Sequence, residues 1–132
     1  PETTACKLVF NNPLRILRNK VLIQKPTLAD LIVAIHRRVE SLISQSENWS
    51  KLLPELLEIS RKTPQENWCG QRLDFLRWSS RQQSEVDMHG VCGELVLPEG
   101  PGSLWPLLAA SQWIHLGKGT IMGLGQPLII HS

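Results

Sequence analysis

Hydrophobic and polar residues alternate at the start of the chain and change to a helical spacing after residue 26. Residues 7–17 are typical of a strand that is broken at residues 11–13, where two asparagines precede a proline. Residues 18–20, Arg-Asn-Lys, supply turn chemistry ahead of the apolar residues 21–23. The pattern therefore predicts a basic β-hairpin near the N-terminal end.

The clearest amphipathic helix of the sequence begins after Thr27. Thr27 offers an N-cap oxygen, and Asp30, three residues later, can complete a capping box. Apolar positions then recur every three or four residues, at Leu28, Leu31, Ile32, Ile35, Val39, Leu42 and Ile43. A second, leucine-rich helix is predicted over residues 52–59, with Pro54 near its start, where a missing backbone N–H is tolerated.

The second half of the chain predicts two strands, a short helix and a last strand. Residues 72–78 and 91–97 alternate as strands do, and the polar residues 79–89 are expected to join them. Ser103 is expected to cap a helix that runs to residue 112, before a glycine-rich loop and a final apolar strand. This order predicts one α+β domain over residues 1–132, a ferredoxin-like (RRM-like) sandwich with helices on one face of an antiparallel sheet.

Composition supports a single globular domain and excludes several classes of protein. The 132 residues are 42% hydrophobic and 20% charged, so the chain can bury a core without disulfides or a metal. Cys6, Cys69 and Cys92 are an odd number of distant cysteines, which favours a reducing compartment, the cytoplasm. The longest apolar run, residues 31–35, is too short to span a membrane, so no membrane association is expected.

Positive charge is concentrated toward the N-terminal end. The net charge is +2, yet residues 1–38 carry seven Lys and Arg residues against two Asp and Glu residues. An excess of five positive charges indicates an anionic partner. An ordinary solvated surface explains the same charge distribution, so charge alone does not decide between the two interpretations.

Residues 115–125 hold the most specific motif of the chain. Four glycines fall within residues 117–125, and such a segment can bring backbone N–H groups close to a phosphate, with Lys118 adding charge. The spacing differs from that of a P-loop and of a dinucleotide-binding fold. A tight glycine-rich connection that closes the sheet is the competing interpretation.

The segment from Trp113 to Leu128 resembles the glycine-rich signature of the CRISPR-associated endoribonucleases that process repeat RNA. That signature has two Gly-hydrophobic-Gly triplets separated by five residues that include a base. Residues 123–125 match the second triplet and residues 118–122 the spacer, whereas His115 stands in place of the first glycine.

Three further segments extend the resemblance over nearly the whole chain. Residues 80–82 are similar to the family's Ser-Arg-Gln stretch, and residues 90–94 to its Gly-x-x-Gly-Glu strand. Residues 10–17 resemble the strand that opens the family's C-terminal half. The resemblance thus implies the C-terminal half of a longer protein that is built from two ferredoxin-like domains.

The resemblance implies cleavage of repeat RNA in precursor CRISPR transcripts to give mature guide RNA, without a metal or cofactor. In the family a side chain, often His, helps the 2′-hydroxyl attack the adjacent phosphate, and the general base often lies in the N-terminal domain. The chain is therefore expected to bind RNA and to cut poorly alone. Its expected partners are repeat RNA, the N-terminal domain and other CRISPR-associated proteins.

The candidate site residues follow from the motif and the basic hairpin. His115 is the candidate catalytic residue, although its imidazole can equally form a structural hydrogen bond at the sheet edge. The candidate RNA contacts are Gly117, Lys118, Gly119, Thr120, Gly123, Gly125, Arg81, Arg15, Arg18 and Lys20.

Other side chains are expected to be structural. His36 is expected to be a packed or half-exposed helix residue. The five tryptophans can stack on bases, yet Trp78 and Trp113 are expected in the core because they lie in apolar segments. His89 and Cys92 are spaced like metal ligands but are expected to be a loop histidine and a buried thiol, with no metal site.

Two other functions stay open at this point. The chain can be a non-catalytic interaction module of a CRISPR ribonucleoprotein, docked through its sheet or its helices. It can also bind a nucleotide or another small phosphate through the glycine-rich segment, although no adenine or ribose contact can be named.

Overall fold

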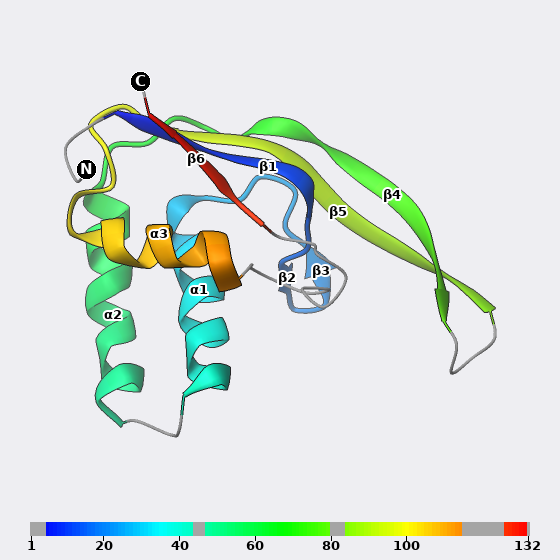
Figure 1. Ribbon diagram of the computed structural model, residues 1–132, viewed down its shortest axis with the longest axis horizontal. Coiled ribbons are helices and arrows are strands. Elements are labelled where there is room, and N and C mark those ends of the chain that lie inside the picture. Colours follow the sequence, from blue (N-terminus) through cyan, green and yellow to red (C-terminus); the bar gives the residue numbers. More distant parts are fainter. Residues whose placement is uncertain (1–4, 44–46, 80–83, 115–125, 132) are drawn as a thin grey trace.

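The structure is a computed structural model that describes residues 5–43, 47–79, 84–114 and 126–131, with backbone alone at residues 47, 74–79 and 84–88. An antiparallel sheet of four strands has the order β4-β5-β1-β6. Its strands are β1 (Cys6–Leu14), β4 (Cys69–Ser79), β5 (Ser84–Leu97) and β6 (Leu128–His131). The helices α1 (Leu28–Leu42), α2 (Glu47–Lys62) and α3 (Trp105–Ile114) lie on one side of the sheet (Figure 1). The predicted ferredoxin-like α+β class is confirmed.

β1 is a central strand and carries the middle of the core. It pairs with β5 on one side and β6 on the other, and its alternate residues Leu8 and Phe10 are buried under the helices. Between Phe10 and Leu14 the register shifts, so that residues 11–13 face a single residue of β5. The predicted break at residues 11–13 is therefore a bulge within the strand, which bends β1 toward the next hairpin.

The basic hairpin forms as predicted. β2 (Leu17–Arg18) and β3 (Val21–Leu22) pair across a two-residue turn. Asn19 and Lys20 have φ values of 52° and 66°, the left-handed conformation that such tight hairpin turns require at both central positions. The hairpin thus places the Arg18 and Lys20 side chains at the surface.

The capping box at the start of α1 is confirmed. The Thr27 hydroxyl accepts a hydrogen bond from the backbone N–H of Asp30, and the Asp30 carboxylate accepts one from the backbone N–H of Thr27 at 2.9 Å. Leu31, Ile32 and Ile35 are fully buried against the sheet. The amphipathic spacing read from the sequence therefore fixes both the start of α1 and the face it buries.

α2 is longer than predicted, and the predicted place of Pro54 is wrong. The helix starts at Glu47, so Pro54 lies inside it rather than near its start. The side chain of Pro54 is exposed, while Leu56 is buried and Leu52 packs against the core. Packing of this apolar face maintains the helix at the proline. The first turn carries one apolar residue, Trp49, among polar ones, which is a weak signal for the start of the helix.

The polar residues 79–89 do not form the predicted linker as a whole. β5 already starts at Ser84, and the ladder with β4 runs from Ser79 paired with Ser84 to Cys69 paired with Glu94. Figure 1 shows this long hairpin extending beyond the helical layer. Polar residues can continue a ladder there because its backbone hydrogen bonds do not depend on burial of side chains.

Ser103 does not cap α3 as predicted. It lies within the 3-10 turn η1 (Gly102–Leu104), and α3 starts after it, at Trp105. Pro106 occupies the first turn of α3, where a missing backbone N–H is tolerated. Leu108 and Ser111 are buried on its inner face. Within the described part of the chain, no helix is long and apolar enough to cross a membrane.

Candidate nucleic-acid interface

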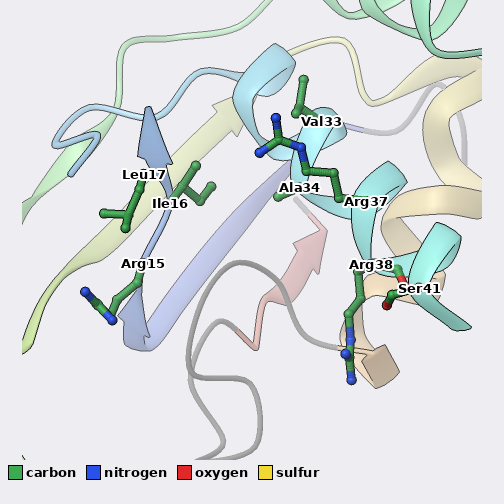
Figure 2. A pocket seen from close by; sticks show the side chains of 8 residues that line it. All are labelled: Arg15, Ile16, Leu17, Val33, Ala34, Arg37, Arg38 and Ser41. Carbon is green, nitrogen blue, oxygen red and sulfur yellow. The ribbon is translucent and has the colours of Figure 1, made fainter. Parts of the chain in front are cut away.

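A partly open pocket of about 230 Å³ separates the segment after β1 from the outer side of α1 (Figure 2). Three guanidinium groups and one hydroxyl combine in it with an apolar wall. The lining residues are Arg15, Ile16, Leu17, Val33, Ala34, Arg37, Arg38 and Ser41. We call this site the arginine pocket.

Two of the three arginines are held by backbone carbonyls from distant parts of the chain. Arg15 Nε donates to the carbonyl of His89 in β5 at 2.7 Å. Arg38 Nε donates to the carbonyl of Ile114 at the end of α3 at 3.1 Å. Figure 2 shows the two side chains on opposite sides of the pocket. Because Nε makes the structural bond, the terminal N–H groups of the planar guanidinium stay available for two oxygens of an anion such as phosphate.

The positive charge of the arginine pocket is not neutralised by the described carboxylates. The ion pairs among described residues involve Lys7, Arg18, His36 and Lys62, and none involves Arg15, Arg37 or Arg38. Arg37 is exposed and Arg38 is half-buried. A partly enclosed site that carries charge of one sign concentrates anions from solution.

The two predicted contacts on the hairpin differ in their surroundings. The Arg18 guanidinium pairs with the carboxylate of Asp30, the same group that caps α1, yet 67% of its side chain remains exposed. Lys20 is exposed at the turn. Since Leu17 lines the arginine pocket and Arg18 follows it, the hairpin extends the basic surface beyond the pocket.

The glycine-rich candidates lie outside the described residues, as does Arg81. They are His115, Gly117, Lys118, Gly119, Thr120, Gly123 and Gly125. The residues on either side of this segment are described, however. Gln126 donates from Nε2 to the carbonyl of Gln112 at 3.3 Å, and Ile129 N–H donates to Gln112 Oε1 at 3.3 Å. These two bonds join the residues before the segment to those after it. The bond from Arg38 to Ile114 holds the residues before it beside the arginine pocket.

His36 is a packed helix residue, as predicted. Its side chain is buried and stacks on Trp49, with ring centroids 4.8 Å apart and planes 6° apart. His36 Nε2 lies 2.7 Å from the Trp49 carbonyl, and Trp49 Nε1 donates to the His36 carbonyl at 3.1 Å. These reciprocal bonds join α1 to α2 and leave His36 remote from solvent.

His89 and Cys92 both lie within β5, so the prediction of a loop histidine is wrong. Cys92 is half-buried, its thiol lies 3.5 Å from the Asn11 carbonyl, and burial raises its pKa. No group of three His, Cys, Asp or Glu residues that could hold a metal exists among the residues the structure describes.

Trp113 is 86% exposed, so its predicted place in the core is wrong. α3 continues to Ile114 instead of ending at residue 112 as predicted, so Trp113 lies in the last helical turn and points outward. Trp78 was also predicted in the core, and its side chain is not among those that the structure describes.

Arg37 and Arg38 contribute to the positive charge of residues 1–38, but no sequence motif assigned them to a site. Ala34, Arg37, Arg38 and Ser41 recur at helical spacing on the edge of the apolar face of α1, and all four line the arginine pocket. That spacing is the signal that could have located the pocket. The opposite wall of the pocket, which carries Arg15, has no such spacing signal, because Arg15 follows the irregular bulge in β1.

Comparison with solved structures shows the same fold in several Cas6 proteins. The product complex of the Cas6 protein TTHA0078 matches with a TM-score of 0.63 and 19% identity, over 100% of this chain and 52% of that one. Thermus thermophilus Cas6 (TTHB231) matches with a TM-score of 0.66 and 17% identity, over 97% and 55% of the two chains. The chain thus spans about half the length of these structures.

A third match extends the comparison to a larger assembly. A partial Cas6-RT-Cas1--Cas2 complex matches with a TM-score of 0.68 and 15% identity, over 99% of this chain and 23% of that one. A comparison with curated protein sequences finds no match. The family model for the CRISPR-associated endoribonuclease Cas6 matches residues 8–127, nearly the whole chain. The chain therefore belongs to the family of the CRISPR-associated endoribonuclease Cas6.

Proposed function

We propose that this chain is the RNA-binding, C-terminal half of an endoribonuclease that cleaves CRISPR repeat RNA into mature guide RNA, and that the arginine pocket binds the RNA backbone. The observation that carries the proposal is the arrangement of Arg15 and Arg38. Each is held through Nε by a backbone carbonyl, and no described carboxylate neutralises either. Membership of the family supplies the identity of the RNA.

The proposed reaction needs positioning and charge stabilisation more than an external reagent. The 2′-hydroxyl of RNA loses its proton and attacks the adjacent phosphate, which becomes a cyclic phosphate as its bond to the 5′-oxygen of the next nucleotide breaks and that oxygen takes up a proton. The nucleophile is thus part of the substrate, and no metal is required. The arginine pocket would fix a phosphate of the repeat and stabilise its negative charge. His115 stays the candidate for moving a proton, and Lys118 and the neighbouring glycines stay candidate phosphate contacts. We expect this processing to occur in the cytoplasm.

The missing part of the machinery is proposed to come from an N-terminal domain of the same protein. Support comes from the solved Cas6 chains, about half of whose length this chain covers. RNA held at the arginine pocket would then be cut by groups from both halves. This chain alone would bind repeat RNA and cleave it poorly.

A second candidate function is a non-catalytic interaction module of a CRISPR ribonucleoprotein. The match to the partial Cas6-RT-Cas1--Cas2 complex favours it, because there the same fold is one part of a much longer chain. In this case a CRISPR-associated protein, and not RNA, would be the partner of the chain.

Binding of a structured RNA hairpin over a salt series tests the proposal. The variants are Arg15→Ala and Arg38→Ala, with Arg61→Ala as the control, since Arg61 is an exposed arginine in the last turn of α2 and does not line the pocket. Each pocket variant is expected to reduce the slope of log affinity against log salt by about one, because one phosphate contact is lost. Arg61→Ala is expected to leave the slope unchanged.

DNA of the same sequence shows whether the chain prefers RNA, and Lys118→Ala tests the glycine-rich segment in the same assay. Equal slopes for the wild type and both pocket variants would exclude the arginine pocket as the phosphate site. Absence of RNA binding by the wild type at low salt, together with tight binding to a CRISPR-associated protein, would select the interaction module.

A further inference from the structure

Trp113 is the most exposed of the large hydrophobic side chains that the structure describes. Its side chain is 86% exposed, and it is the only aromatic residue among the described exposed ones. Tryptophan is among the more buried residue types on average, since its large apolar surface favours removal from water. The inner face of α3 is already filled by Leu108 and Ser111, so Trp113 contributes nothing to the core.

The position of Trp113 connects it to the arginine pocket. Its neighbour Ile114 accepts the hydrogen bond from Arg38 Nε. A phosphate held by the terminal N–H groups of Arg38 would therefore lie close to the end of α3 that carries the exposed indole ring. Because each nucleotide carries a base beside its phosphate, RNA bound in the pocket brings bases near this ring.

We infer that Trp113 stacks on an unpaired nucleobase of RNA whose backbone is bound in the arginine pocket, an inference that rests on the proposed function. The base must be unpaired, because the faces of bases inside a duplex are covered by their neighbours. Stacking on an aromatic side chain is tolerant of sequence, since every base offers a π-face. Trp113 therefore favours an RNA with a single-stranded flank next to its hairpin over a fully paired RNA.

The surroundings of Trp113 favour a base over a protein surface as its occupant. The other exposed residues on the outer face of α3 are Pro106 and Ala110, which offer little apolar area. The exposed Leu128 and Ile130 belong to β6, where Ile129 between them is the residue packed against the core. They consequently point to the sheet face opposite the helices, away from α3. On α3 the ring thus stands alone, and its sequence neighbour Ile114 is bonded to Arg38. A single ring beside a basic pocket fits a nucleotide, whereas a protein interface needs a continuous patch.

The test compares two hairpin RNAs that differ only in the bases of a single-stranded 3′ flank. One probe carries an oligoadenylate flank, and the other carries the same flank with abasic sugars, so their phosphates are identical. The wild-type chain is expected to bind the first about tenfold more tightly, as loss of one stacked base predicts. Trp113→Ala should bind both equally, and Trp113→Phe should recover most of the preference.

Leu42→Ala is the matched control, since it shortens another exposed apolar side chain, at the end of α1. It should keep the tenfold preference. If Trp113→Ala keeps the preference, or weakens binding of both probes equally, stacking on the flank is wrong while salt-dependent RNA binding still supports the proposed function. If the wild type binds neither probe at low salt, both the proposed function and the stacking role fail.

Discussion

Arg38 donates its Nε hydrogen to the carbonyl of Ile114, the last residue of α3, at 3.1 Å. The two residues are 76 positions apart, so this bond fixes the end of α3 against α1. A cation at the C-terminal end of a helix is stabilised by the helix dipole and satisfies a carbonyl that has no partner within the helix. Arg38 thus serves the fold through Nε and stays available to a ligand through its terminal N–H groups.

Arg38→Lys separates the charge of this residue from its shape. Lysine keeps the positive charge but lacks the planar fork and the Nε donor. We expect the salt dependence of RNA binding to stay close to that of the wild type, while the affinity falls about tenfold because a charged hydrogen bond is lost. Filter binding of the hairpin RNA at several salt concentrations measures both quantities. A wild-type affinity for Arg38→Lys would show that charge alone recruits the phosphate.

Gln112→Ala is expected to loosen the edge strand β6. Gln112 Oε1 accepts the hydrogen bond of the Ile129 N–H, on a strand that pairs with β1 at the edge of the described sheet. Its loss should lower the free energy of unfolding by about 1 kcal/mol and speed amide exchange at Ile129. Gln112→Glu retains an acceptor oxygen and should keep that amide protected. Unchanged exchange at Ile129 in Gln112→Ala, measured by NMR, would contradict the assigned bond.

The fold could be predicted from the sequence wherever periodicity and capping agree. α1 shows both signals, and its start at Leu28 follows from Thr27 and Asp30. The extensions of β5 to Ser84 and of α2 to Glu47 were missed, because each segment carries few apolar residues among polar ones and its ordering depends on a paired strand or a packed helix elsewhere.

Asp30→Ala is expected to destabilise the fold by about 1–2 kcal/mol because the capping box is lost. Asp30 accepts the backbone N–H of Thr27 and also pairs with Arg18. Asp30→Asn keeps an acceptor oxygen for the cap and removes the charge, so it should cost less than Asp30→Ala. Urea unfolding of both variants measures the difference. Equal losses would mean that the ion pair with Arg18, and not the cap, stabilises this corner.

Gly70→Ala and Gly102→Ala are expected to differ strongly in stability. A Cβ at Gly70 would collide with the Cys92 carbonyl and lie 2.7 Å from Gly93 Cα, both of which are backbone atoms of the paired strand. We expect a loss of about 3 kcal/mol or more, since the strands must separate to make room. Gly102 has φ +59° and open space around it, so alanine there should cost only about 1 kcal/mol of backbone strain. Thermal unfolding of the two variants compares them, and similar melting temperatures would exclude the close approach of the strands.

The candidate site could be predicted only in part, because its components are distant along the chain. The basic N-terminal end indicated an anionic partner, and Arg15, a predicted RNA contact, lines a pocket that the sequence did not reveal. The partnership of Arg38 with Ile114 depends on how α3 crosses α1, which no sequence spacing encodes. For Trp113 the sequence signal was misleading. Its apolar neighbours in the sequence predicted burial, whereas the geometry of α3 turns its side chain toward solvent.

The three cysteines are expected to react with iodoacetamide in the order Cys69, Cys92, Cys6. Cys69 is exposed, Cys92 is half-buried and Cys6 is 1% exposed. Burial raises the pKa of Cys6 and Cys92 above the usual 9.0, which reduces their reactive thiolate at a given pH. Mass spectrometry of the chain alkylated for increasing times at pH 8 gives the order. Early modification of Cys6 would contradict its buried place in β1.

The same pKa shifts predict how stability changes at alkaline pH. Because the folded state favours the protonated thiols of Cys6 and Cys92, the stabilisation that they contribute is fully present below pH 9.0 and is lost as the pH rises through their raised pKa. Urea unfolding at pH 8 and at pH 10 should therefore show a decrease in the free energy of unfolding. Cys6→Ala should show a smaller decrease than the wild type, since one of the two titrating thiols is gone. An equal decrease in both proteins would mean that Cys6 does not titrate with a raised pKa in the folded chain.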